Sequence, residues 1–309
     1  MNKPISYAVH LYGQYPYQEL LNTFESDNLF HYTTSSTLLN ILEKKKLRFS
    51  NRLYLNDKSE GKYVLDLCIK RIYDIWPHTS KYDSNKFVEA LSSLSNNINL
   101  EHFQFYQVSL CKDGDNLTMW NYYSQGDGVN IKFSTSTLIE SFKAHLHNPV
   151  MESTALLHGY VIYDEDEQIK IIKDMLREFV STEEFIDEWY MFTSWAILNI
   201  GTFFKHRGFQ DEREYRIAYN LFNHPETPTQ CLSLYRDQAY QTPYCFEVYQ
   251  RKNMLVPYVD IDFNSDAIRA ITLSPNVAAN YYADGLRLML YKYKLSEVEI
   301  TTSQIPLRF

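Results

Sequence analysis

LFHYTTSSTLLNILEKKKLRFS, residues 29–50, predicts a strand, a capped helix and a second strand in direct succession. Residues 29–33 and 47–50 have the composition of short strands. Between them, Thr34 or Ser35 can cap a helix, because a side-chain oxygen there accepts a hydrogen bond from a free amide of the first turn. The apolar positions of this helix are Leu38, Leu39, Ile41 and Leu42.

The rest of the chain combines short strands with clustered helices. Asp57, with Glu60 three residues later, resembles a capping box and predicts that a helix starts there. This mixture favours an α+β fold over a doubly wound α/β fold. Further helices are expected near 80–99, 119–123, 169–179, 184–204 and 277–290, and strands at 103–110, 129–133, 160–163, 215–219, 245–249, 268–273 and 298–301.

The domain organisation expected from these patterns is simple. Residues 1–28 form a polar N-terminal leader, and residues 29–309 form a single domain with helical insertions near 80–100 and 165–205. The chain contains no internal repeat and no convincing linker between independent domains. One core is therefore expected to organise the protein.

The charge balance limits the partners of the chain. A formal net charge of −8 and a pI near 5.6 argue against unspecific binding to nucleic acids, which requires a concentrated positive surface. A local basic cluster exists at Lys44, Lys45, Lys46 and Arg48. The 26 tyrosines suit half-buried strands and also pockets that stack ligands.

Metal sites, disulfides and membrane spans are not expected. The four cysteines include no C-x-x-C pair, so neither a zinc site nor a disulfide framework is indicated. His145 and His147 have no nearby cysteine or carboxylate partner and are interpreted as surface residues. No stretch approaches eighteen consecutive apolar residues, and no signal peptide is visible, so a cytoplasmic protein is expected.

The first candidate for a binding site is the tripeptide His31, Tyr32 and Thr33. It lies at the end of a strand and just before a capped helix, where side chains and free backbone amides converge. Such a position suits a nucleotide. A purely structural role for the His-Tyr pair is the alternative.

Further candidates follow along the chain. Asn56 can reach a pocket or order a turn, whereas the neighbouring Asp57 is better explained as a helix cap. Ser109 ends a predicted strand, and several aromatic residues follow in a short helical segment. Those rings can stack a nicotinamide or an adenine, or can simply pack in the core. They are Trp120, Tyr122 and Tyr123.

The most chemical pattern is Glu212, Glu214 and Arg216, which strand periodicity places on one face. Two carboxylates and a guanidinium in a row can orient a ribose hydroxyl and stabilise a developing positive charge. The alternative is a solvated ladder of ion pairs, which would contribute little. The chain has no G-x-G-x-x-G, G-x-x-x-x-G-K-[ST] or H-E-x-x-H motif, so Rossmann, P-loop and zincin folds are not indicated.

Four ordered motifs resemble a bacterial family described as domain of unknown function 2971. They are LFHYTTSSTLLNILEKKKLRFSNRLYLNDKSE, VSLCKDGDNLTMWNYYSQGDGVNIKF, KHRGFQDEREYRI and SQIPLR, and together they span residues 29–308. That family is distantly similar to ADP-ribosyltransferases. The resemblance implies a split mixed or antiparallel β-sheet with surrounding helices, and a pocket that binds NAD.

The same resemblance implies roles for individual residues. His31 would hold the ribose next to nicotinamide, Tyr32 or Tyr122 would stack the nicotinamide ring, and Ser109 would brace the pocket. Glu214 would be the catalytic carboxylate, with Glu212 orienting the acceptor. The remaining candidates for contact with NAD are Thr33, Asn56, Trp120 and Arg216. Arg216 so close to Glu214 is not a general feature of such transferases.

Three hypotheses about function follow. The first is an NAD-consuming enzyme that transfers ADP-ribose to a protein or nucleic acid or hydrolyses NAD, and the resemblance implies a toxin or phage-defence effector with a neutralising or activating partner. The second is a non-catalytic module that senses a nucleotide or binds a partner. The third is a metal-dependent nuclease using Asp211, Glu212 and Glu214. Under the first, Glu214→Gln is expected to abolish turnover and to leave folding intact.

Overall fold

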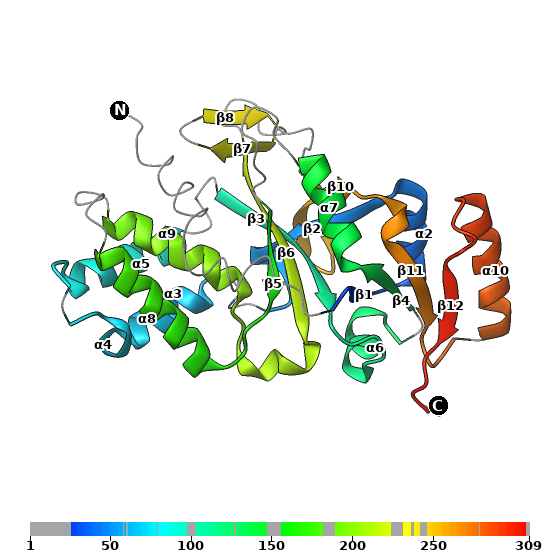
Figure 1. Cartoon of the computed structure of the whole chain (residues 1–309), viewed down its shortest axis with the longest axis horizontal. Helices are drawn as coiled ribbons and strands as arrows, with labels where there is room; N and C mark the ends of the chain where they lie inside the picture. Colours follow the sequence, from blue (N-terminus) through cyan, green and yellow to red (C-terminus); the bar gives the residue numbers. More distant parts are fainter. Residues whose placement is uncertain are drawn as a thin grey trace.

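The computed structural model describes residues 26–306, except for residues 58, 60, 79, 98–102, 127, 147–155, 182–188, 224–230, 236–237, 242–245 and 278. The described chain forms one twelve-stranded sheet with helices packed around it (Figure 1). The strands are β1 (Asn28–Thr33), β2 (Lys46–Asn51), β3 (Phe103–Cys111), β4 (Val129–Ser134), β5 (Leu156–Tyr160), β6 (Glu214–Asn223), β7 (Cys231–Tyr235), β8 (Gln238–Gln241), β9 (Glu247–Arg251), β10 (Met254–Asp262), β11 (Ile268–Leu273) and β12 (Glu299–Thr302).

The helices come from all parts of the described chain. The α-helices are α2 (Ser35–Lys44), α3 (Tyr63–Lys70), α4 (Ile72–Ile75), α5 (Ser84–Asn97), α6 (Leu117–Tyr123), α7 (Thr135–Leu146), α8 (Glu165–Ser181), α9 (Trp189–Ile200) and α10 (Ala279–Lys292). Short 3-10 helices are η2 (Arg52–Tyr54), η3 (Gly201–Phe203), η4 (Arg207–Glu212) and η5 (Ser265–Ala267). Among the described residues, no helix combines the length and the apolar character needed to cross a bilayer.

The sheet is open and mostly antiparallel, which confirms the predicted α+β class. Its main path runs β12-β11-β4-β1-β3-β2-β10-β9, and β6 joins it through β3 and carries β5 and β7. β11 and β12 are parallel, and the other described strand pairs are antiparallel. The strand–helix–strand unit expected at residues 29–50 is present as β1, α2 and β2.

Strand β3 is the branch point of the sheet, because two strands share one of its edges. On the opposite edge, β6 pairs with β3 from Phe103 to Cys111. On the shared edge, β2 pairs with Tyr106 and Gln107, whereas β1 pairs with Cys111. Residues 108–110 lie between these two pairings. β1 and β2 therefore separate from each other along residues 108–110 of β3.

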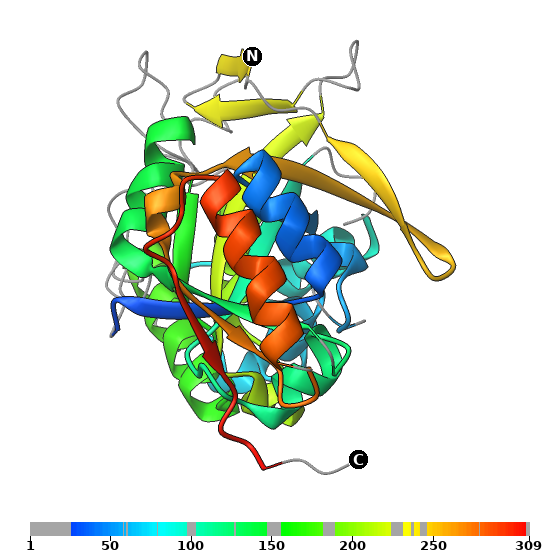
Figure 2. The ribbon, with the colours of Figure 1, turned by 90° about the vertical axis from the view of Figure 1, so that its right-hand side faces the viewer.

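Two apolar cores pack against the sheet, and alternate residues of β6 belong to different cores. Tyr215 and Ile217 lie in the core covered by α2, α7 and α10, while Ala218 lies in the core formed with α3, α5, α8 and α9. Figure 1 shows the latter helices together beside the sheet, and Figure 2 shows α2 and α10 over the other part. The two predicted helical insertions thus pack together through α5 and α9.

The turn before β4 requires the two glycines that precede the strand. Gly126 has φ of 82°, which side chains rarely adopt. At Gly128 a Cβ atom would lie 2.2 Å from the carbonyl oxygen of Thr33. The absence of a side chain at Gly128 therefore lets the segment after α6 pack closely against the end of β1. This contact places α6 beside β1.

Two local predictions are wrong. The helix expected to start at Asp57 begins at Tyr63, and the carboxylate of Asp57 instead accepts hydrogen bonds from the amide and hydroxyl of Ser59. The strand expected at 160–163 is β5, which ends at Tyr160. At Asp57 the local polar turn delays the helix. After Tyr160, Ile162 pairs with Phe204 in an isolated bridge instead of with β6.

Candidate functional site

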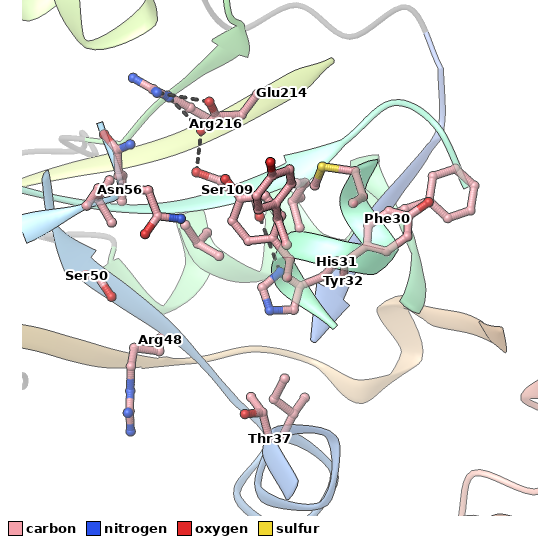
Figure 3. A pocket seen from close by; sticks show the side chains of 18 of the residues that line it. Phe30, His31, Tyr32, Thr37, Arg48, Ser50, Asn56, Ser109, Glu214 and Arg216 are labelled. Atoms are coloured by element: carbon pink, nitrogen blue, oxygen red, sulfur yellow. Dashed lines mark hydrogen bonds and ion pairs between the residues drawn. The ribbon is translucent and has the colours of Figure 1, made fainter. Parts of the chain in front are cut away.

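A cavity of about 480 Å³ opens where β1 and β2 diverge from β3. Figure 3 shows His31 from β1 and Ser109 from β3 in its middle, with Glu214 and Arg216 from β6 on one side. Because β3 pairs directly with β6, Ser109 faces Arg216 across the strand pair. The cavity therefore has a floor of three strands, and α2, α6 and β9 contribute to its walls.

Glu214 is buried at this floor and is saturated with hydrogen-bond donors. Arg216 donates from Nε at 2.7 Å and from Nη2 at 2.9 Å, one bond to each carboxylate oxygen. Lys205 donates to Oε2 at 3.2 Å, and the hydroxyl of Ser109 donates to Oε1. A carboxylate has about four acceptor positions. Glu214 is thus not a free carboxylate, which differs from the role expected for it.

The charges around Glu214 keep it ionised. Burial raises the pKa of this carboxyl, but the nearby Arg216 and Lys205 outweigh burial and lower the pKa from 4.5 to about 2. A carboxylate with a lowered folded-state pKa contributes stability above its unfolded pKa, and the contribution is lost as the pH falls through the folded pKa. The buried ion pair therefore makes the stability of the fold depend on pH in the acidic range.

Acid titration of stability tests this coupling. We expect the free energy of unfolding of the wild-type protein to fall as the pH drops from about 4.5 towards about 2, because the unfolded chain takes up the proton first. In Glu214→Gln this part of the decrease should be missing. Urea titrations across that range measure it, and parallel curves for the two proteins would contradict the expectation.

Glu212 reaches the same place from a different element. It is the last residue of η4, not a residue of the strand, so the expected strand face holds only for Glu214 and Arg216. Arg213 has φ of 43°, and this left-handed residue ends η4 between the two carboxylates. Glu212 then accepts from Lys205 Nζ at 2.6 Å and from the Tyr123 hydroxyl at 2.9 Å.

The bonds of Glu212 leave it able to contact a ligand. Lys205 binds one of its oxygens and Tyr123 binds the other, so each oxygen keeps one acceptor position. The Glu212 side chain is 12% exposed, against 5% for Glu214, and both residues line the cavity. Glu212 is therefore the carboxylate that a ligand hydroxyl can reach without breaking an existing bond.

His31 completes a connection across the floor. Its Nδ1 lies 3.3 Å from the carbonyl oxygen of Ser109, which can only accept, so Nδ1 carries the proton. Burial lowers the pKa of His31, which favours the neutral ring. Nε2 is then an acceptor. His31 and Glu214 both bond to Ser109, one to its carbonyl and the other to its hydroxyl.

The cavity brings together most of the residues predicted for the site. Thr33 and Trp120 do not line it: Thr33 is buried in β1, and Trp120 packs edge-on against Tyr32 at 4.8 Å. Tyr32 lines the cavity but is 5% exposed, whereas Tyr122 is 76% exposed at the mouth. The predicted residues that line the cavity are His31, Tyr32, Asn56, Ser109, Tyr122, Tyr123, Glu212, Glu214 and Arg216.

Lys205 is the central site residue that the sequence patterns do not predict. It is 4% exposed and bridges both carboxylates. A signal for Lys205 was present in the sequence, because it is the first residue of the motif KHRGFQDEREYRI. The residue lies outside helices and strands, however, so no periodic pattern indicated it. Three basic residues of the cavity wall, Lys44, Lys46 and Arg48, were noted only as part of a cluster in the sequence, and a fourth, Arg251, was not singled out.

A metal centre has little support in the described part of the chain. There, no group of three or more histidine, cysteine, aspartate or glutamate side chains could hold a metal ion. Between Glu212 and Glu214 the ammonium group of Lys205 occupies the position that a bridging cation would need. His145 bonds through Nδ1 to the carbonyl of Ser141 in its own helix, and His147 lies outside the described residues.

Residues 119–217 match the model of a family described as protein of unknown function (DUF2971). The matched segment contains most of α6, Lys205 and both carboxylates, and it confirms the resemblance to this family over these residues. No curated protein and no solved structure matches the chain.

Proposed function

We propose that this protein consumes NAD, releasing nicotinamide and passing ADP-ribose to a macromolecular acceptor or to water. The observation that carries the proposal is the connected floor of the cavity, where His31, Ser109 and Glu214 come from three strands and are joined by hydrogen bonds. The divergence of β1 and β2 around β3 supports a split sheet of the kind that the resemblance to ADP-ribosyltransferases implies.

The chemistry follows from the two acceptors that remain available. The bond between the ribose carbon and nicotinamide breaks, its electron pair leaves with nicotinamide, and the ribose carbon becomes positively charged. Glu212 accepts a ribose hydroxyl and places negative charge near this carbon, while His31 Nε2 accepts a second hydroxyl. A nucleophile, water or a group of the acceptor, then bonds to the carbon and loses its proton to solvent water. Tyr122, exposed at the mouth, stacks on the nicotinamide ring.

Glu214 contributes by position in this scheme. It holds Ser109, Arg216 and Lys205 in place, and Lys205 in turn orients Glu212. The saturation of Glu214 also favours the second candidate function, a module that binds a nucleotide without turnover. Nucleotide binding without nicotinamide release would select that candidate.

The direct test is mass-spectrometric detection of free nicotinamide after incubation of the purified protein with NAD, with and without bacterial lysate as a source of acceptors. Release above that of heat-inactivated protein supports the proposal, and ADP-ribose on lysate molecules separates transfer from hydrolysis. A toxin or defence role, which the resemblance implies, predicts that expression lowers cellular NAD. The absence of release under both conditions would reject the enzymatic function.

The aromatic contact gives a sharper expectation. Tyr122→Ala should raise KM for NAD roughly tenfold with little change in kcat, since stacking on a ring contributes about 1–3 kcal/mol to binding. Tyr281→Ala is the matched control, because Tyr281 is 88% exposed on α10 and does not line the cavity. Equal KM values for the two variants would exclude Tyr122 as the stacking residue.

A further inference from the structure

The wall of the cavity opposite Glu214 is polar and basic. Helix α2 turns one face towards the cavity, and the residues on it are spaced three to four apart, as one face of a helix requires. Three of them are polar: Thr37, Asn40 and Lys44. Figure 3 shows Thr37 far from Glu214, on the other side of the cavity.

Strand β2 contributes a second row to the same wall. Lys46, Arg48 and Ser50 line the cavity, while the alternating Leu47 and Phe49 are buried in the core. Alternate residues of β2 therefore point to opposite faces, one towards the cavity and one towards the core. Because α2 runs directly into β2, one continuous segment of chain supplies both rows.

Arg48 is held in a fixed orientation on this wall. Its Nε donates to Asp260 Oδ1 at 3.1 Å, and its Nη2 donates to Oδ2 at 3.5 Å. The guanidinium lies 3.6 Å from the ring centroid of Tyr258 and 5.0 Å from that of Tyr249. A side chain already ordered in this way loses little further freedom when it binds a ligand.

The local charge is positive although the chain is acidic. Lys44, Lys46, Arg48 and Arg251 line this wall, and two carboxylates pair with them: Asp260 with Arg48 at 3.1 Å and Asp262 with Lys46 at 3.5 Å. The cations still outnumber these carboxylates. Arg251 is anchored through Nη2, which donates to the carbonyl of a residue in η2. The whole chain has a net charge of −8, so the positive charge of this wall is a local feature. Small anions are the ligands that such a wall attracts.

We infer that this wall is a diphosphate subsite, in which Arg48 and Lys44 bind the two phosphate groups of a dinucleotide. The inference rests on the proposed function for the identity of the ligand, since the wall itself indicates only an anion. Guanidinium groups match phosphate oxygens in geometry and charge. Figure 3 shows Arg48 and Thr37 on the side of the cavity away from Glu214, so the subsite sets the direction of the ligand: phosphates towards β2 and the reacting ribose towards β6.

Binding of ADP-ribose measured by isothermal titration calorimetry tests the subsite independently of turnover. Arg48→Gln should weaken ADP-ribose binding roughly tenfold to hundredfold, and Arg48→Lys should weaken it less, because the charge remains without the planar fork. Lys44→Gln, at an exposed position that leaves the Arg48–Asp260 pair intact, gives a second reading free of folding effects. Arg287→Gln on α10 is the control, an exposed arginine paired with Asp284.

The outcomes separate the subsite from the proposed function. Adenosine, which has no phosphate, should bind wild type and Arg48→Gln equally, and inorganic pyrophosphate should compete with ADP-ribose. If ADP-ribose binds and depends on Arg48 and Lys44 while NAD is not consumed, the subsite stands and the enzymatic function fails. If nicotinamide is released but neither substitution changes ADP-ribose binding, the subsite is wrong. Failure of the wild type to bind ADP-ribose also rejects the subsite.

Discussion

Replacing Glu214 with glutamine is expected to lower the free energy of unfolding by about 3–5 kcal/mol, the cost of breaking a buried ion pair by removing one partner. Arg216 is fully buried and donates two bonds to this carboxylate, and Lys205 is 4% exposed. An amide can accept at one atom only and carries no charge. The substitution therefore removes the charged partner to which the buried guanidinium donates two bonds.

Urea denaturation followed by circular dichroism measures the effect. The matched control is Glu165→Gln, because Glu165 also pairs with an arginine, Arg71, at 3.0 Å, but the two side chains are 41% and 36% exposed. An exposed pair contributes at most about 1 kcal/mol. A Glu214→Gln variant within 1 kcal/mol of the control would show that the buried network does not stabilise the fold.

This result bears on how activity data are interpreted. The sequence pattern alone led to the expectation that Glu214→Gln leaves folding intact, because strand periodicity says which face a residue lies on and nothing about its partners. The structure shows four donors on that carboxylate. Loss of activity in Glu214→Gln is therefore compatible with loss of structure, and Glu214 is a poor residue with which to test catalysis.

Periodicity predicts the elements of this fold better than their ends. Leu38, Ile41 and Leu42 are buried in α2 as expected, and Thr34 is the cap, accepting a bond from the amide of Thr37. Leu39, which the same pattern included, is 43% exposed. Helical spacing identified the apolar residues of α2, but it could not say how wide the buried face would be.

Tertiary contacts explain some of the elements that the sequence interpretation missed. β10 lies between β2 and β9 and contains Pro257, a residue that argues against a strand when the sequence is taken alone. Helix α7 follows β4 directly, with polar and apolar residues mixed at its start. Its Leu138 and Phe142 are buried in the core. Packing against the sheet decides β10. The buried residues of α7 do recur at helical spacing, a local signal that the sequence interpretation did not use.

The site was predicted as separate pieces, and the pairing of strands joins them. His31, Ser109 and Glu214 are far apart in the sequence, and each was chosen for its own chemistry. No sequence pattern supplies the register of the strands. β3 pairs with β6 so that Ser109 faces Arg216, and β1 pairs with β3 only at Cys111. Lys205 was missed because a coil residue becomes central only when the two carboxylates meet around it.

Glu212→Gln is expected to reduce nicotinamide release roughly 10²–10³-fold, the usual cost of removing one group that stabilises charge in a transition state. The reduction should appear in kcat, because the charge on the ribose carbon exists only in the transition state. Stability should change little. Lys205 keeps its bond to Glu214, and glutamine can still accept from Tyr123.

The control for this variant lies next to it. Asp211 is exposed on η4 and does not line the cavity, so Asp211→Asn makes the same chemical change one residue away. Single-turnover kinetics on both variants, with unfolding curves measured in parallel, separate chemistry from folding. If both variants release nicotinamide within threefold of the wild type, Glu212 is not the carboxylate that supports the reaction. Because Glu214 has no acceptor position left, such a result would move the proposal from catalysis to nucleotide binding.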